Sequence, residues 1–180
     1  MTNKQEKMIC NSFGIAKLKA FQKNVITDLL NGKDVLGLAR TSEGKSICFL
    51  SMIAMHPNDL LIGILPTVAL MRDLVQRCED SEIRAGCLYS GNAENTNIIE
   101  KLKHGRLQAL FLAPERLNDP HLWKAIQKNK VHTVVVDEVH CLTEWGNEFR
   151  PMYRNIGRFI KDLPSSPVVA AFSATVMQED

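Results

Sequence analysis

The amino-acid sequence predicts an α/β fold in which helices flank both faces of a doubly wound, mostly parallel sheet. Short apolar runs alternate with segments whose apolar residues recur every three or four positions. Several of these runs end directly at polar residues suited to binding phosphate or metal. Alternating strands and helices build βαβ units, and sheets of this kind bind ligands beyond the carboxyl ends of their strands.

The apolar runs predict six strands that are buried on both faces, as strands between two helix layers must be. The predicted strands are residues 35–38, 60–65, 86–89, 109–112, 133–136 and 168–172. The predicted helices are residues 47–55, 68–78, 95–103, 122–128 and 152–162. Thr67 is suited to cap the second of these helices, and Pro151 suits the first turn of the last one.

Composition indicates one globular domain over residues 1–180, since the chain is 45% hydrophobic and 23% charged. The net charge of +2 is close to neutral, so any nucleic-acid surface must be a local patch. The five cysteines lack CxxC spacing, so we expect small buried side chains in a reducing cytosol. We expect no zinc site, and no membrane contact, because no apolar run approaches the roughly 18 residues of a span.

A phosphate-binding loop follows the first predicted strand. Residues 39–46 are Ala-Arg-Thr-Ser-Glu-Gly-Lys-Ser. They lie between a predicted strand and a predicted helix, and in this context Gly-Lys-Ser indicates a phosphate-binding loop. We expect Lys45 to reach the terminal phosphates and the Ser46 hydroxyl to bind Mg²⁺. The expected nucleotide-binding residues of the loop are Thr41, Ser42, Glu43, Gly44, Lys45 and Ser46. Taken alone, the motif is also compatible with a plain turn and helix cap.

Two adjacent acids, Asp137 and Glu138, follow the fifth predicted strand. Adjacent carboxylates beside a core lose hydration and repel one another, and a bound Mg²⁺ offsets that cost. We expect Asp137 to hold the metal, directly or through water, and Glu138 to orient and deprotonate the attacking water. The alternative is a strand end that directs both acids into solvent, and the phosphate loop argues against it.

The ordered motifs resemble those of superfamily 2 helicases, and among them the RecQ family, from Phe13 to Thr175. The matching segments are residues 65–71, residues 113–117, the Asp-Glu-Val-His box at 137–140 and Ser-Ala-Thr at 173–175. The resemblance implies a RecA-like fold of the P-loop NTPase class, with ATP and Mg²⁺ as cofactors. It also implies that His140, Ser173 and Thr175 couple the nucleotide state to the DNA site.

Phe13-Gly14, followed by Lys19 and Gln22, is similar to the adenine-recognition motif of RecQ helicases. The resemblance implies that the Gln22 amide pairs with the edge of adenine, because an amide offers both a donor and an acceptor. Lys19 is the basic residue that lies nearby in this motif. These two residues complete the expected nucleotide site.

The segment Trp-Gly-Asn-Glu-Phe-Arg-Pro at 145–151 is similar to the aromatic-rich loop of RecQ helicases. The resemblance implies that Trp145 and Phe149 stack on bases of single-stranded DNA and that Arg150 contacts a phosphate. Judged without the resemblance, packing of both aromatic rings on the following helix is the favoured interpretation.

The resemblance implies that the chain is the first motor domain of an ATP-dependent DNA helicase, which couples ATP hydrolysis to translocation and unwinding. The implied partners are single-stranded or partly duplex DNA and a second RecA-like domain, which we expect to lie outside these 180 residues. The implied location is the cytoplasm, or the nucleus in a eukaryote. Two alternatives remain: a degenerate helicase-like module that binds nucleotide or DNA without turnover, and a P-loop kinase or transport ATPase.

Overall fold

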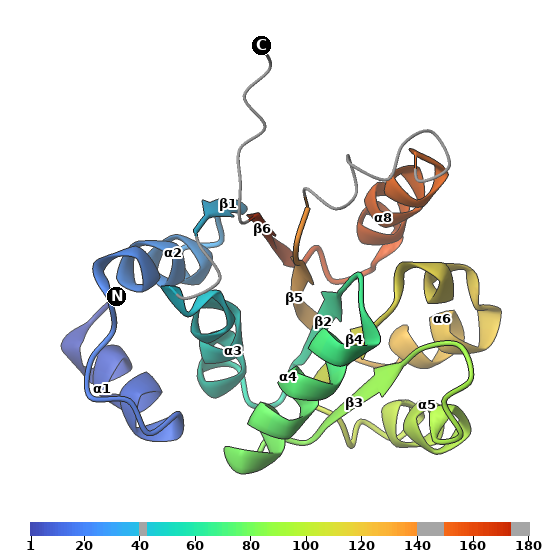
Figure 1. The fold of residues 1–180 in the computed structure, drawn as a ribbon, viewed down its shortest axis with the longest axis horizontal. Helices are drawn as coiled ribbons and strands as arrows, with labels where there is room; N and C mark the ends of the chain where they lie inside the picture. The colour runs from blue at the N-terminus through green and yellow to red at the C-terminus, as the bar shows by residue number, and fades with distance from the viewer. Residues whose placement is uncertain (40–42, 140–149, 174–180) are drawn as a thin grey trace.

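The computed structural model describes residues 1–39, 43–139 and 150–173, without the side chains of residues 150–154. Within this part of the chain a six-stranded sheet forms the centre of the molecule (Figure 1). The strands are β1 (Val35–Leu38), β2 (Leu60–Ile64), β3 (Ala85–Leu88), β4 (Ala109–Leu112), β5 (Val131–Val136) and β6 (Val168–Ser173). Their order is β1-β6-β5-β2-β4-β3, and all five neighbouring pairs are parallel. The predicted fold class is therefore confirmed.

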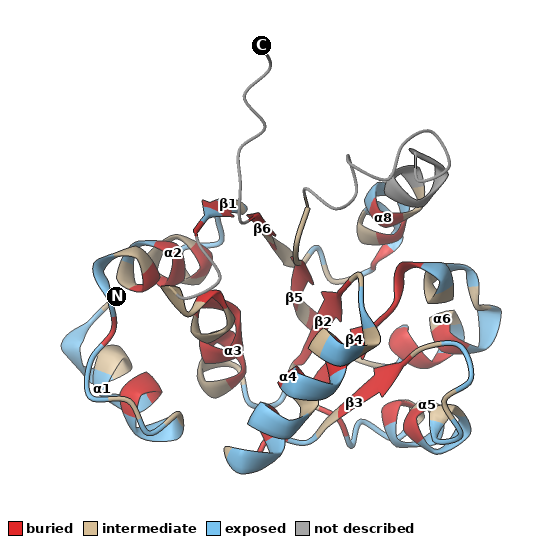
Figure 2. Cartoon of the chain, in the orientation of Figure 1, coloured by how far each residue is buried: buried red, intermediate tan, exposed pale blue. Residues whose placement is uncertain are grey.

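Helices cover both faces of the sheet. One layer contains α1 (Asn3–Ser12), α2 (Ala20–Leu30), α3 (Lys45–Met55) and α4 (Val68–Asp80). The other contains α5 (Asn95–Lys103), the short 3-10 helix η2 (Pro114–Asn118), α6 (Pro120–Ile126) and α8 (Arg150–Asp162). Figure 2 shows buried residues on the sides of α3, α5 and α6 that face the sheet, whereas the buried residues of α1 pack against α2 and α3. None of the helices in the described residues is long and apolar enough to cross a membrane.

Alternate residues of the inner strands belong to two different cores. Phe111 of β4 and Val135 of β5 pack with α3 and α4, whereas Leu110 and Val134 pack with α5, α6 and α8. This alternation follows from the two-residue period of a strand. It explains why the sequence of these strands is apolar without interruption.

The prediction that all six strands are buried on both faces is wrong for β1. This strand lies at the edge of the sheet and pairs only with β6. Leu36 and Leu38 point to its uncovered face and are 65% and 49% exposed. The apolar run identified the strand correctly, but it contained no information about the strand's place in the order.

Local capping agrees with the sequence. The Thr67 hydroxyl accepts a hydrogen bond from the Leu70 amide at 3.3 Å and so caps α4 as predicted. Pro151 lies in the first turn of α8. The predicted helix 122–128 instead begins at Pro120 because the Asp119 carboxylate caps it, accepting from the His121 amide at 2.9 Å. Four of the five cysteines lie in the described residues and are free and buried, as expected: Cys10, Cys48, Cys78 and Cys87.

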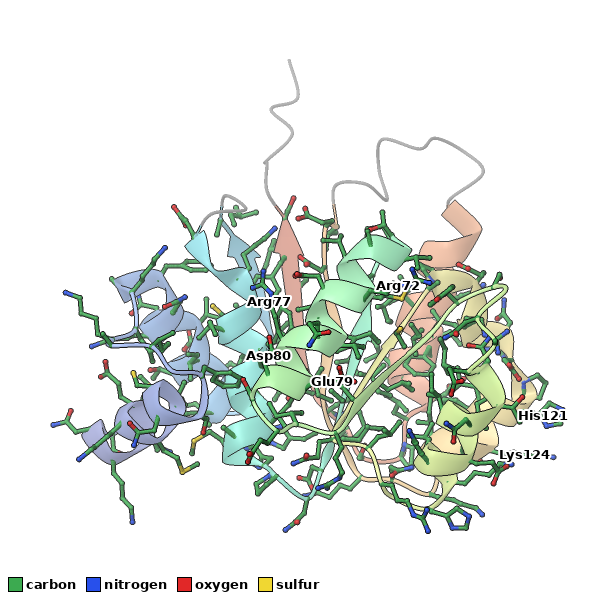
Figure 3. The ribbon with its side chains drawn as sticks, turned by 60° about the horizontal axis from the view of Figure 1, so that its bottom comes forward. Arg72, Arg77, Glu79, Asp80, His121 and Lys124 are labelled. Carbon is green, nitrogen blue, oxygen red and sulfur yellow. The ribbon has the colours of Figure 1, made fainter. Side chains whose placement is uncertain are left out.

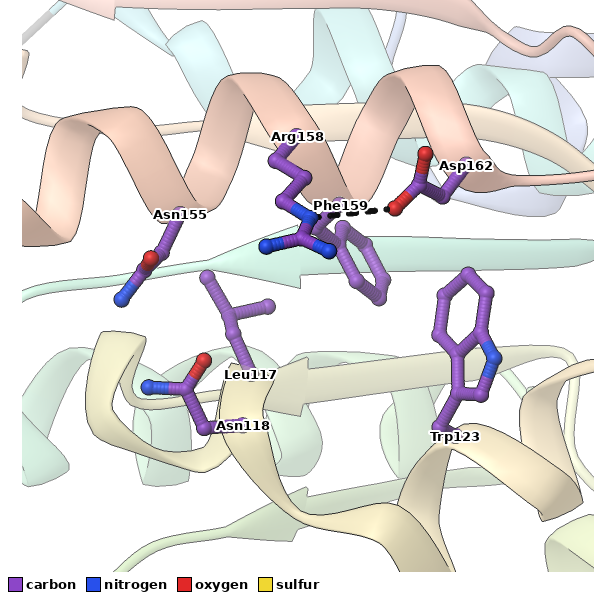
Figure 4. A pocket seen from close by; sticks show the side chains of 7 residues that line it. All are labelled: Leu117, Asn118, Trp123, Asn155, Arg158, Phe159 and Asp162. Atoms are coloured by element: carbon purple, nitrogen blue, oxygen red, sulfur yellow. Dashed lines mark ion pairs between the residues drawn. The ribbon is translucent and has the colours of Figure 1, made fainter.

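Helix α8 is fixed against η2 and α6 by apolar side chains. The rings of Phe159 and Trp123 meet edge to face, with 5.6 Å between their centroids. Leu117 of η2 lies beside them and lines a pocket of about 140 Å³ (Figure 4). Arg158 and Asp162 of α8 line the same pocket, and the guanidinium and the carboxylate are 3.5 Å apart. The helix that follows residues 140–149 is thus anchored at its far end.

Two histidines stack at the edge of the sheet opposite the carboxyl ends of the strands. The rings of His56 and His132 lie 3.4 Å apart between centroids and nearly parallel. Burial lowers the pKa of both imidazoles. Asp59 raises and Lys130 lowers the pKa of each, and His56 further lowers the pKa of His132. We therefore expect both rings to be neutral in the folded protein near pH 7.

Acid should destabilise the fold through this histidine pair. The unfolded chain binds protons at the ordinary histidine pKa of 6.5, whereas the folded chain binds them only at lower pH. The free energy of unfolding should therefore fall as the pH drops through 6.5 toward the lower folded-state pKa. Urea denaturation between pH 7.5 and 5 tests this. His132→Gln should flatten the pH dependence, and His104→Gln, at an exposed histidine, should not. Identical slopes in all three proteins would contradict this account.

Candidate nucleotide-binding site

The structure describes Ala39 of the phosphate loop and the segment from Glu43, which leads into α3. Gly44 is the residue before the helix and has φ +76°, in the left-handed region that glycine favours. A Cβ atom at this position would lie 2.7 Å from the Gln22 side-chain nitrogen, so the Gln22 amide would have to shift. The backbone conformation is therefore the main reason for glycine at position 44. Thr41 and Ser42 of the predicted loop lie outside the described residues.

Lys45 lies at the centre of the site and contacts both predicted acids. Its Nζ donates a hydrogen bond to Glu138 Oε1 at 2.8 Å and lies 3.7 Å from Asp137 Oδ1. The lysine side chain is 6% exposed, and those of Asp137 and Glu138 are 12% and 14% exposed. The start of α3 and the end of β5 thus meet at the carboxyl edge of the sheet. The alternative in which both acids point into solvent is wrong.

The backbone holds the two acids in place between neighbouring strands. The Asp137 amide donates to the Ile64 carbonyl, and the Val139 amide donates to the Phe172 carbonyl at 2.8 Å. Glu138 between them has φ +52°, an uncommon conformation for a residue with a side chain. Its amide donates to Asp137 Oδ1 at 2.9 Å.

Burial raises the pKa of the Asp137 carboxyl, and the Lys45 ammonium opposes that rise. A carboxylate in such a place is stabilised by any additional cation that binds beside it. The electrostatics of this edge of the sheet therefore favour a bound cation next to Asp137.

A pocket of about 110 Å³ opens beside these residues and is lined by Gly44, Lys45, Ser46, Asp137 and Glu138. Mg²⁺ is bound in proteins by one or two oxygen side chains, with waters and phosphate oxygens supplying the other ligands. The Ser46 hydroxyl and the Asp137 carboxylate fit this chemistry. No group of three His, Cys, Asp or Glu side chains suited to holding a metal occurs among the described residues. Ser46 and Asp137 would supply two oxygen ligands to Mg²⁺ beside the phosphate loop.

Gln22 connects α2 to the phosphate loop. Its Nε2 donates to the Gly44 carbonyl at 3.1 Å and to the Glu43 carbonyl at 3.4 Å, while its Oε1 accepts from the Lys19 amide at 2.8 Å. The residue is 4% exposed. In this structure the Gln22 amide supports the loop, and adenine recognition by Gln22 and Lys19 stays a prediction.

Ser173 lies at the end of β6, next to the phosphate loop. It is buried, and its carbonyl accepts a hydrogen bond from the Ala39 amide at 3.1 Å. This places the first residue of the predicted Ser-Ala-Thr motif beside the start of the loop. The other predicted coupling residues, His140 and Thr175, lie outside the described residues. So do Trp145 and Phe149 and the side chain of Arg150.

One wall of the pocket was not predicted from the sequence. Leu70, Asp73, Leu74 and Arg77 of α4 line it opposite the phosphate loop. Their spacing of three, four and seven positions puts them on one side of a helix. The same spacing was visible in the sequence, but nothing there indicated that this side faces Ser46. The Arg77 Nη1 donates to the Ser46 hydroxyl at 3.2 Å.

Comparison with known proteins agrees with this geometry. Residues 19–180 match the family model described as DEAD/DEAH box helicase. The ATP-dependent DNA helicase RecQ of Haemophilus influenzae is 32% identical over 160 residues, covering 88% of this chain and 26% of that protein. The probable ATP-dependent DNA helicase RecS of Bacillus subtilis is 33% identical over 179 residues, covering 98% of this chain and 35% of that protein. The chain thus spans about a quarter to a third of these relatives.

Solved structures share the fold. The helicase MrfA bound to DNA superposes with a TM-score of 0.76 at 21% identity, over 98% of this chain and 27% of that one. A hypothetical ATP-dependent RNA helicase from Sulfolobus tokodaii gives a TM-score of 0.74 at 19% identity, over 97% and 51%. The fold, the meeting of the phosphate loop with the acidic box, and the family match over nine-tenths of the sequence agree. This chain belongs to the DEAD/DEAH box helicase family.

Proposed function

We propose that the chain is the ATP-binding motor domain of a RecQ-like DNA helicase. The observation that supports this best is Lys45, which lies between Glu138 at 2.8 Å and Asp137 at 3.7 Å in the pocket that Ser46 also lines. A lysine and a hydroxyl at the start of a helix, facing two carboxylates at the end of a strand, are the groups that phosphoryl transfer from Mg-ATP needs. The RecQ and RecS relatives named above are described as ATP-dependent DNA helicases.

The lysine, the hydroxyl and the two carboxylates then have separate tasks. Lys45 exchanges its carboxylate partners for phosphate oxygens when nucleotide enters. Ser46 and Asp137 would hold Mg²⁺, which would supply positive charge to the phosphates when bound. Glu138, released from Lys45, accepts a proton from the attacking water. The contact between Lys45 and Glu138 therefore belongs to the nucleotide-free site, and it ends when the site fills.

Further roles extend this proposal to DNA. Ser173, Thr175 and His140 transmit the nucleotide state, and Trp145, Phe149 and Arg150 contact single-stranded DNA through stacking and a phosphate contact. Gln22 and Lys19 recognise adenine. A second RecA-like domain completes the site with an arginine that stabilises the charge developing on the transferred phosphoryl group.

The rate of ATP hydrolysis by the full-length protein tests this function. We expect hydrolysis to require Mg²⁺ and to be faster with single-stranded DNA than with RNA of the same sequence or without nucleic acid. Trp145→Ala should reduce the stimulation by DNA while the basal rate is kept. Nucleotide binding without turnover under every condition would instead support the degenerate helicase-like module.

A further inference from the structure

Helix α4 contributes a second cation to the nucleotide pocket. Of the four residues on its pocket side, Leu74 is buried and Leu70 is half-buried, whereas Asp73 and Arg77 are polar. Figure 3 shows Arg77 on the side of α4 nearer α3, away from Arg72 at the other end of the helix. Arg72 is bound to the Tyr89 hydroxyl at 2.6 Å and takes no part in the pocket.

Within the described residues, Arg77 has polar contacts with two oxygen atoms. Its Nη1 donates to Ser46 Oγ at 3.2 Å, and its Nε lies 2.9 Å from a carboxylate oxygen of Asp73, one helical turn earlier. A hydroxyl and a carboxylate are also the ligands that Mg²⁺ prefers. Arg77 thus binds, in the nucleotide-free site, the hydroxyl that the proposed function assigns to the metal.

We propose that Arg77 is a positioning residue that competes with Mg²⁺ for the Ser46 hydroxyl. This inference rests on the proposed function of the pocket. The arginine keeps Ser46 oriented while the site is empty, and it must move away before the metal binds. The competition raises the Mg²⁺ concentration that nucleotide binding requires.

Electrostatics favour this competition. A guanidinium keeps its charge at every physiological pH, so it cannot become neutral when Mg²⁺ approaches. Two cations that share one hydroxyl oxygen lie within a few ångströms of each other and repel strongly. Arg77 keeps Asp73 as its ion-pair partner when it moves away from Ser46. The side chains of Asp73 and Arg77 are 56% and 55% exposed. The arginine can therefore move toward solvent without disturbing the core.

The test compares Arg77→Met with Arg72→Met, which removes the same charge from the same helix outside the pocket. Binding of a fluorescent ADP analogue to the 180-residue chain is measured while Mg²⁺ is titrated. We expect the Mg²⁺ concentration for half-maximal binding to fall about twofold to fivefold in Arg77→Met, the range for an exposed charged interaction. Arg72→Met should match the wild type, and binding in EDTA should be equal in all three proteins.

The outcomes of this titration distinguish a failure of the proposed competition from a failure of the proposed nucleotide-binding function. A Mg²⁺ midpoint that is unchanged or higher in Arg77→Met, with normal nucleotide binding by the wild type, overturns the competition alone. Weaker binding of the variant at every Mg²⁺ concentration also overturns it, because Arg77 would then be a phosphate ligand. Absence of nucleotide binding by the wild type at any Mg²⁺ concentration would overturn both. Equal melting temperatures establish that Arg77→Met is folded.

Discussion

Replacing Lys45 by Ala should abolish Mg-ATP binding and reduce hydrolysis by at least about 100-fold, since the pocket loses the cation that contacts the terminal phosphates. The same change should destabilise the nucleotide-free protein. Lys45 is the counter-charge of two carboxylates that are only 12% and 14% exposed. Removal of one partner from a buried pair costs roughly 3 kcal/mol, because the other charge remains desolvated. Nucleotide titration and urea denaturation measure the two effects.

Lys33→Ala is the matched control for this variant. Lys33 also pairs with a carboxylate, that of Asp28 at 3.1 Å, but the two side chains are 66% and 45% exposed. An exposed pair of this kind contributes less than about 1 kcal/mol, so stability and ATP binding should hardly change. Unchanged turnover in Lys45→Ala would exclude the phosphate-binding role of this loop.

Glu138→Gln should reduce ATP hydrolysis without weakening nucleotide binding. The amide has the size of the carboxyl group but cannot accept a proton, so hydrolysis should fall by about 10²–10⁴-fold, the usual contribution of a general base. Binding should persist or tighten, because the change removes a negative charge beside the incoming phosphates and weakens the contact that retains Lys45 at 2.8 Å. Single-turnover kinetics give the hydrolysis rate, and binding of a fluorescent nucleotide gives the affinity.

Glu79→Gln serves as the control, since Glu79 is an exposed residue near the end of α4. Glu79→Gln should leave the hydrolysis rate and the nucleotide affinity unchanged. If Glu138→Gln weakened nucleotide binding as much as hydrolysis, Glu138 would be part of the binding surface and its role as a base would be wrong.

The sequence predicted the elements of the sheet better than their arrangement. Six apolar runs became six parallel strands because burial between two helix layers requires uninterrupted apolar sequence. The same rule misjudged β1, whose Leu36 and Leu38 are exposed at the edge. Helix α1 was missed because only two of its ten residues, Ile9 and Cys10, are buried. Helix α2 was missed although Val25, Ile26 and Leu29 have helical spacing.

In the site, too, the sequence predicted some residues but not the contacts that depend on how helices pack. Lys45, Asp137 and Glu138 were predictable because each follows a strand, and the carboxyl ends of parallel strands meet at one edge. Gln22 and Arg77 have contacts that depend on how α2 and α4 pack against α3, and no local pattern specifies that packing. The hydrogen bond from Arg77 to Ser46 spans 31 positions and became visible only in three dimensions.

A crystal structure of the chain with Mg²⁺ and a non-hydrolysable ATP analogue would show whether nucleotide and metal occupy the pocket around Lys45. We expect phosphate oxygens within about 3 Å of Lys45 Nζ, Mg²⁺ on the Ser46 hydroxyl beside Asp137, and Glu138 released from Lys45. Nucleotide bound elsewhere, with the contact of 2.8 Å between Lys45 and Glu138 intact, would contradict it.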